Sequence, residues 1–191
     1  MWTAKILLPV LMLLIGGGWF DSILSKTEKR RALLSIPLIF GLCFVPQLRE
    51  PTVRALAAPC AWLLLTALFC STDRPVGALL AAVLGGMIGW KLIDTFPLFP
   101  EPGLFCAVPT ALLCALYCRE RNAKALAIAA APFVMLFFRA VGDYALFQSA
   151  VLELGDGDSL AAQSAGFLFL LLGGLVSERF SHRFKRLHSV A

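Results

Sequence analysis

Long apolar runs alternate with short polar stretches over most of the chain. Most runs approach the roughly 20 apolar residues, or about 17 at the short end, that a helix needs to cross a membrane. Charged residues gather between the runs, where a membrane protein has its loops. The pattern predicts an all-α fold, a polytopic transmembrane helical bundle of seven spans. The expected spans are residues 6–24, 32–48, 53–70, 76–93, 103–118, 125 to between 138 and 152, and 160–177.

Two segments leave the span count open, and six spans is the alternative. Residues 32–48 would form a helix of roughly 25 Å, just enough for an untilted crossing of a thin membrane. The sixth segment has no clear end before residue 152. The stretch 95–102 carries three prolines and is therefore expected to be a connector that is not helical throughout.

The lysines and arginines between the segments divide unevenly when the loops are assigned alternately to two sides. Twelve fall on one side and four on the other, as the positive-inside rule expects of a correct alternation. The N-terminus is then outside and the C-terminus cytoplasmic. The cytoplasmic set is Lys26, Lys29, Arg30, Arg31, Arg74, Arg119, Arg121, Lys124, Arg179, Arg183, Lys185 and Arg186, and the outer set is Lys5, Arg49, Arg54 and Lys91.

The composition leaves no room for a separate soluble domain. The chain is 59% hydrophobic and 15% charged, whereas a soluble domain has about 45–50% apolar and about 25% charged residues. Residues 1–177 are expected to be one transmembrane helical domain, and 178–191 a basic, amphipathic cytoplasmic tail. The net charge of +5 lies in short loops and this tail. It therefore indicates topology and contact with the anionic headgroups of a lipid bilayer, and no nucleic acid.

Small residues line one face of the fourth segment. Close backbone contact at small residues drives helix association in lipid, and Gly85 and Gly89 have the GxxxG spacing. The face predicts packing within the chain; the alternative is a homodimer that forms through it. The residues expected to pack are Ala78, Ala81, Ala82, Gly85 and Gly89.

The best candidates for a binding site are charged residues inside or beside the apolar segments. Arg139 and Asp143 are four residues apart and share a helix face. Arg139 lies about 22 Å beyond Lys124 along a continuous helix, where an unpaired charge is costly. The pair predicts a substrate-binding or proton site facing the bundle interior, extended by Tyr144 and Gln148. In the alternative, the helix is short or bent and Arg139 reaches the outer headgroups.

A second outer cluster contains Lys91 and Asp94, which follow Trp90. With the proline-rich stretch, it would form either a lid over the site of Arg139 and Asp143 or a rigid connector.

Motifs for catalysis, metals and cofactors are missing from the sequence. Both histidines lie in the tail, and no HExxH, GxSxG or P-loop occurs. The six cysteines include no CxxC pair. The chain is therefore expected to be no enzyme and to hold no metal or cofactor.

The Gly17-Gly18-Trp19 sequence, the basic loop 26–31, the chain length and the span count resemble the YphA-type family of small multi-pass membrane proteins from spore-forming bacteria. The resemblance implies a bacterial cell membrane and no defined activity. The first functional hypothesis is a non-enzymatic protein that assembles with other membrane proteins. The alternative is a small-solute transporter, or a substrate-binding transporter subunit, with its site around Arg139 and Asp143.

Overall fold

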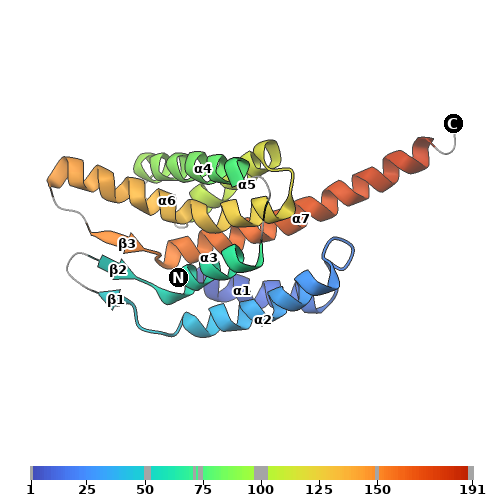
Figure 1. Ribbon diagram of the computed structural model, residues 1–191, viewed down its shortest axis with the longest axis horizontal. Coiled ribbons are helices and arrows are strands. Elements are labelled where there is room, and N and C mark those ends of the chain that lie inside the picture. The colour runs from blue at the N-terminus through green and yellow to red at the C-terminus, as the bar shows by residue number, and fades with distance from the viewer. Residues whose placement is uncertain are drawn as a thin grey trace.

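The computed structural model describes residues 2–49, 53–70, 72, 75–96, 103–148 and 151–188. These residues form seven helices and three short strands, and the helices run back and forth along one long axis (Figure 1). The elements are α1 (Trp2–Gly16), α2 (Lys26–Leu42), β1 (Leu48–Arg49), β2 (Val53–Ala55), α3 (Ala57–Phe69), α4 (Pro75–Thr95), α5 (Gly103–Tyr117), α6 (Arg121–Phe147), β3 (Leu152–Leu154) and α7 (Gly157–His188).

Among the described residues, three helices are long and apolar enough to cross a membrane. They are α4, α6 and the part of α7 from Gly157 to Phe180, with 21, 27 and 24 residues. The helical fold of a membrane protein is thus supported. The apolar helices α1, α3 and α5 have 15, 13 and 15 residues. At 1.5 Å per residue they measure about 20–22 Å, less than the hydrocarbon thickness of about 30 Å.

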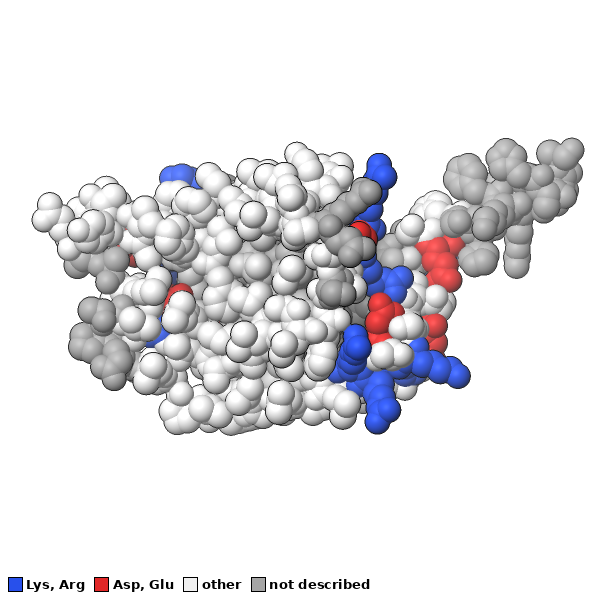
Figure 2. Space-filling view, viewed as in Figure 1, with Lys and Arg blue, Asp and Glu red and all other residues white. Residues whose placement is uncertain are grey.

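Large hydrophobic side chains are exposed around the bundle. Leu13 of α1, Leu68 of α3 and Leu116 of α5 are 74%, 76% and 78% exposed. A soluble monomer rarely presents so much contiguous apolar surface to water. Figure 2 shows a broad band with few charged residues, bounded by a belt of lysine and arginine at the end from which α7 projects. This surface suits a lipid environment.

A small sheet replaces the last residue of the second predicted segment and the first three residues of the third. Residues 53–55 were expected to begin the third span, but they form β2, which pairs antiparallel with β1 and parallel with β3. The first predicted segment is also shorter than expected, because α1 ends at Gly16 and turns follow. The fourth to seventh segments coincide broadly with α4 to α7. Most of the proline-rich connector and the side chains beyond residue 180 lie outside the described part.

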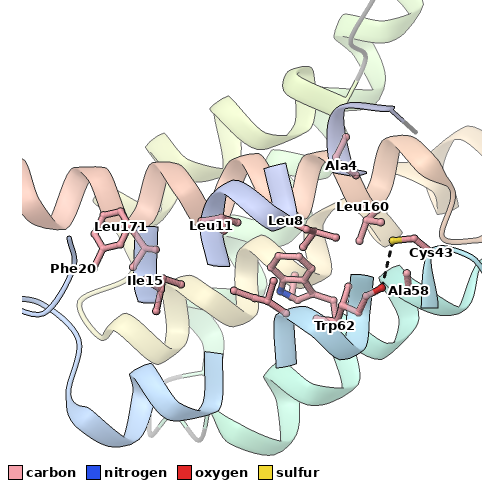
Figure 3. Close-up of a cluster of buried hydrophobic side chains, with 14 residues drawn as sticks. Ala4, Leu8, Leu11, Ile15, Phe20, Cys43, Ala58, Trp62, Leu160 and Leu171 are labelled. Carbon is pink, nitrogen blue, oxygen red and sulfur yellow. Dashed lines mark hydrogen bonds between the residues drawn. The ribbon is translucent and has the colours of Figure 1, made fainter. Parts of the chain in front are cut away.

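One hydrophobic core surrounds α1. Leu8, Leu11 and Ile15 recur on one helix face and are at most 1% exposed. They form one cluster with buried residues of α2, α3 and α7, and Figure 3 shows Trp62 of α3 and Leu171 of α7 in it. The ring of Trp62 also meets that of Phe167 edge to face, with centroids 6.0 Å apart. α1 is thereby held among the other helices.

The second core depends on the small-residue face of α4. A Cβ added at Gly89 would lie 2.9 Å from the Cα of Cys106 in α5, and one at Gly86 would lie 2.7 Å from the carbonyl oxygen of Ala131 in α6. At Gly85 it would collide with Thr110. α5 and α6 of the same chain therefore cover the face. The other small residues expected to pack, Ala78, Ala81 and Ala82, are buried there too.

Substitution of Gly89 by alanine tests this close packing. The added methyl group would press on the α5 backbone, and overpacking of this kind costs about 1–3 kcal/mol. We expect Gly89→Ala to lower the midpoint of thermal unfolding in detergent micelles. Gly41→Ala is the matched control, because a Cβ at Gly41 meets nothing within 4 Å and alanine favours a helix by roughly 0.5–1 kcal/mol. Equal midpoints for the two variants would contradict the packing described here.

Candidate functional site

The rotation of α6 is set by its contact with α4. The ring of Trp90 in α4 stacks on Phe138 with centroids 6.0 Å apart and planes at 17°. A Cβ added at Gly142 would lie only 3.1 Å from the same indole ring. Phe138 and Gly142 therefore face α4. Each residue of a helix is turned by roughly 100° from the one before, so Arg139 and Asp143 occupy a different face.

That face of α6 forms one wall of a cavity of about 370 Å3 at the end of the bundle where the sheet lies. We call it the strand-end cavity. Its opposite wall comes from β2 and β3, which contribute Arg54 and Glu153, and its volume falls in the range of about 300–1,000 Å3 typical of ligand sites. The lining residues are Arg54, Leu136, Arg139, Ala140, Asp143, Phe147, Val151 and Glu153.

Two of the four charged groups in the cavity pair with each other. Arg54 and Glu153 lie directly opposite on the parallel strands, and Arg54 Nη1 is 3.7 Å from Glu153 Oε1. No ion pair joins Arg139 to Asp143 among the described residues. An arginine that precedes its acidic partner by four residues has the less favourable order for a helix pair. These two side chains are therefore available to a ligand.

The structure brings together only two of the six predicted site residues. Arg139 and Asp143 line the strand-end cavity, but both are exposed, so they do not face the bundle interior as predicted. Tyr144 and Gln148 are exposed as well and do not line the cavity. Lys91 and Asp94 pair with each other on α4 at 3.9 Å. The Lys91 ammonium also lies 4.0 Å from the ring centroid of Trp90. The predicted lid over Arg139 would include residues outside the described part.

Arg54 and Glu153 are site residues that the sequence reading did not single out. Arg54 stands only among the outer loop charges, and Glu153 carries no sequence-based prediction, because strands of three residues leave almost no periodic pattern. Their side chains meet only because β2 pairs with β3, which lies about half of the chain length further along the sequence. The available signal was that an arginine and a glutamate border apolar segments on the side that is otherwise poor in basic residues.

The ionisable side chains of the cavity are two arginines and two carboxylates. Among the described residues, no group of three or more His, Cys, Asp and Glu side chains could hold a metal ion. The lining side chains provide two carboxylates and two guanidinium groups, with no thiol, hydroxyl or imidazole. Comparisons with protein-family models, curated proteins and solved structures found no match to this chain. The chemistry must be inferred from the geometry alone.

A double-mutant cycle measures the interaction energy between Arg54 and Glu153 in the wall of the cavity. We expect Arg54→Gln and Glu153→Gln to couple by about 0.2–1 kcal/mol in the free energy of unfolding, the range for exposed and cross-strand ion pairs. Thermal unfolding of both single variants and the double variant in detergent gives this energy. Lys91→Gln with Asp94→Asn is the control cycle on one helix, where about 0.2–0.5 kcal/mol is expected. A coupling of zero for Arg54 and Glu153 would contradict their pairing.

Proposed function

We propose that this chain is a multi-pass membrane protein that binds a small zwitterionic solute in the strand-end cavity. The observation that carries the proposal is the convergence of two basic and two acidic side chains on one ligand-sized cavity. A solute of amino-acid size carries a carboxylate and an ammonium group. The guanidinium of Arg139 would bind the first, and the carboxylate of Asp143 the second, through charge-assisted hydrogen bonds. The Arg54–Glu153 pair would close the opposite side.

The proposed role of the cavity is to bind the solute, without covalent catalysis. The lining side chains lack the hydroxyl, thiol and imidazole groups that most often form covalent intermediates or transfer protons. Ordered charges of both signs suit recognition, because each charged group of the solute exchanges water for a protein partner. The chain would act as a carrier or as the solute-binding subunit of a transporter.

The proposed arrangement has seven helices across a cell membrane, with the N-terminus outside and the C-terminus in the cytoplasm. It is supported by the alternating course of the helices and by the basic belt at one end of the apolar band. Positive charge on short loops favours the cytoplasmic side. The short helices α1, α3 and α5 lie beside longer neighbours, and a membrane can thin locally around a short span. The strand-end cavity would then face outward.

Assembly with other membrane proteins is the second candidate. It is favoured by the C-terminal end of α6, where Tyr144, Leu146 and Phe147 are 63%, 77% and 71% exposed beside the cavity. A partner that covered these side chains would also border the bound solute. Gentle purification followed by mass spectrometry would separate this role from that of a self-contained carrier, because only a subunit copurifies with a stoichiometric partner.

Accessibility to an impermeant thiol reagent tests the orientation. Thr27 and Ala145 are exposed residues at opposite ends of the bundle. In intact cells we expect Ala145→Cys to react and Thr27→Cys to react only after the membrane is permeabilised. The unsubstituted chain, with its six native cysteines, is the control for background labelling. Labelling of Thr27→Cys from outside would reverse the proposed orientation.

Ligand-induced stabilisation tests the site. We expect at least one member of a panel of the standard amino acids to raise the unfolding midpoint of the purified protein, since a ligand at 100 times its Kd stabilises by about 2.7 kcal/mol. Arg139→Gln and Asp143→Asn should each weaken binding by about tenfold to a hundredfold, the loss expected for one charged hydrogen bond.

The matched controls for these variants are Lys91→Gln and Asp94→Asn, which change the same charges outside the cavity. They should bind like the unsubstituted protein. A panel in which no compound stabilises the unsubstituted protein, or in which the Arg139 and Asp143 variants bind normally, would refute the proposed site.

A further inference from the structure

A second cavity lies at the opposite end of the bundle, and the proposed solute site does not use it. α2 packs on α1 and α3, and a space of about 340 Å3 separates it from α6 and α7. This volume is again within the range of about 300–1,000 Å3 for ligand sites. We call it the basic-end cavity, because it opens where the basic residues of α2 and α6 lie.

The interior of the basic-end cavity is mainly apolar, and it includes the hydroxyl groups of Ser35 and Thr66, the second of which donates to the carbonyl oxygen of Trp62. Ile36 and Ile39 of α2 are 3% and 2% exposed, and they face the space together with Trp62 and Leu65 of α3. Phe167 of α7, whose ring contacts that of Trp62, closes the far side. A wall of aliphatic and aromatic side chains offers dispersion contacts and no hydrogen bonds, so it suits a hydrocarbon chain.

The mouth of the cavity is polar and carries two arginines. Arg31 Nη1 donates to the carbonyl oxygen of Phe69 at 3.1 Å, and its guanidinium lies 5.4 Å from the Phe69 ring centroid. Arg121 donates to the carbonyl oxygen of Ile23. Each guanidinium group is thus held at the rim by a hydrogen bond to a backbone carbonyl oxygen. Because a guanidinium has five N–H donors, each has donors left for an anion.

One acidic residue, Glu28, also lies at the mouth, but its charge is already engaged. Its carboxylate accepts the backbone N–H of Ser25 at 2.7 Å and lies 3.5 Å from Arg121 Nη1. Burial alone would raise the pKa of Glu28. The hydrogen bonds with Ser25 and the charges of Arg121 and Arg31 outweigh this effect and lower the pKa. Glu28 therefore stays ionised, and two arginines against one glutamate leave the mouth net positive.

We propose that the basic-end cavity binds one anionic phospholipid, with an acyl chain against the apolar wall and the phosphate at Arg31 and Arg121. The apolar interior and the cationic mouth complement the two parts of such a lipid. The mouth lies at the basic end of the bundle, and Figure 2 shows the basic belt beside the apolar band, where the headgroups of a surrounding bilayer would lie. The inference is independent of the zwitterion site, because no residue lines both cavities.

Thermal unfolding in detergent, titrated with phosphatidylglycerol or phosphatidylcholine of the same acyl chains, tests the site. We expect phosphatidylglycerol to stabilise the unsubstituted protein at a concentration about tenfold lower than phosphatidylcholine, because both carry a phosphate but the choline cation of the second is repelled by the net positive mouth. The double variant Arg31→Gln/Arg121→Gln should lose this preference. Lys26→Gln/Arg30→Gln removes two exposed charges from the same region, outside the cavity lining, and should retain it.

A second pair of variants tests the acyl-chain site without changing charge. Ser35 lines the cavity, and Ser35→Phe should fill it and abolish the effect of phosphatidylglycerol. Leu34 is 67% exposed and does not line the cavity, so Leu34→Phe should have no effect. The unfolding midpoint of each variant without lipid shows whether it folds.

Four results would overturn the proposal. The first is equal stabilisation by the two lipids. The second is an equal loss of the preference for phosphatidylglycerol in Arg31→Gln/Arg121→Gln and Lys26→Gln/Arg30→Gln, which would indicate surface attraction alone. The third is a Ser35→Phe variant that folds and still responds to phosphatidylglycerol. Inorganic phosphate alone should not stabilise the protein, and stabilisation equal to that by the lipid would also exclude an acyl-chain site.

Discussion

Close backbone contact of α4 with α5 and α6 is the constraint on which the arrangement of this bundle depends. Helices in lipid gain no hydrophobic free energy by meeting, so they associate where small residues let backbones approach. Gly85, Gly86 and Gly89 supply those positions. The same contact places Trp90 against Phe138 and Gly142, and α6 is thereby oriented with its charged residues toward the sheet.

Backbone hydrogen bonding shapes the end of the bundle opposite the basic belt. N–H and C=O groups near a membrane need partners in the protein wherever water is scarce. Two strands and the turn after β3 provide them: the Leu56 N–H donates to the carbonyl oxygens of Leu154 and Gly155. Gly155 has a φ of +80°, and a Cβ there would lie 2.9 Å from Pro59. This tight turn brings β3 beside β2, and Arg54 beside Glu153.

The two cavities differ in chemistry because they are bounded by different parts of the same helices. At the strand end, charged residues of α6 face charged residues of short strands, and the result suits a small polar solute. At the basic end, the apolar middle of α2 and α3 faces α7, and arginines stand only at the rim. A solute site and a lipid site at opposite ends would let the surrounding membrane influence the same bundle that binds the solute.

The sequence by itself determined the helical membrane character, the approximate places of the helices and the small-residue face of α4, because hydropathy and residue size act locally. It also singled out Arg139 and Asp143, since a charge within an apolar segment is visible without a fold. Only the tertiary structure decided that residues 53–55 form a strand, that Tyr144 and Gln148 do not line the cavity, and that Arg54 and Glu153 do. Strand pairing and helix rotation depend on contacts between residues far apart in the chain, and no local pattern encodes them.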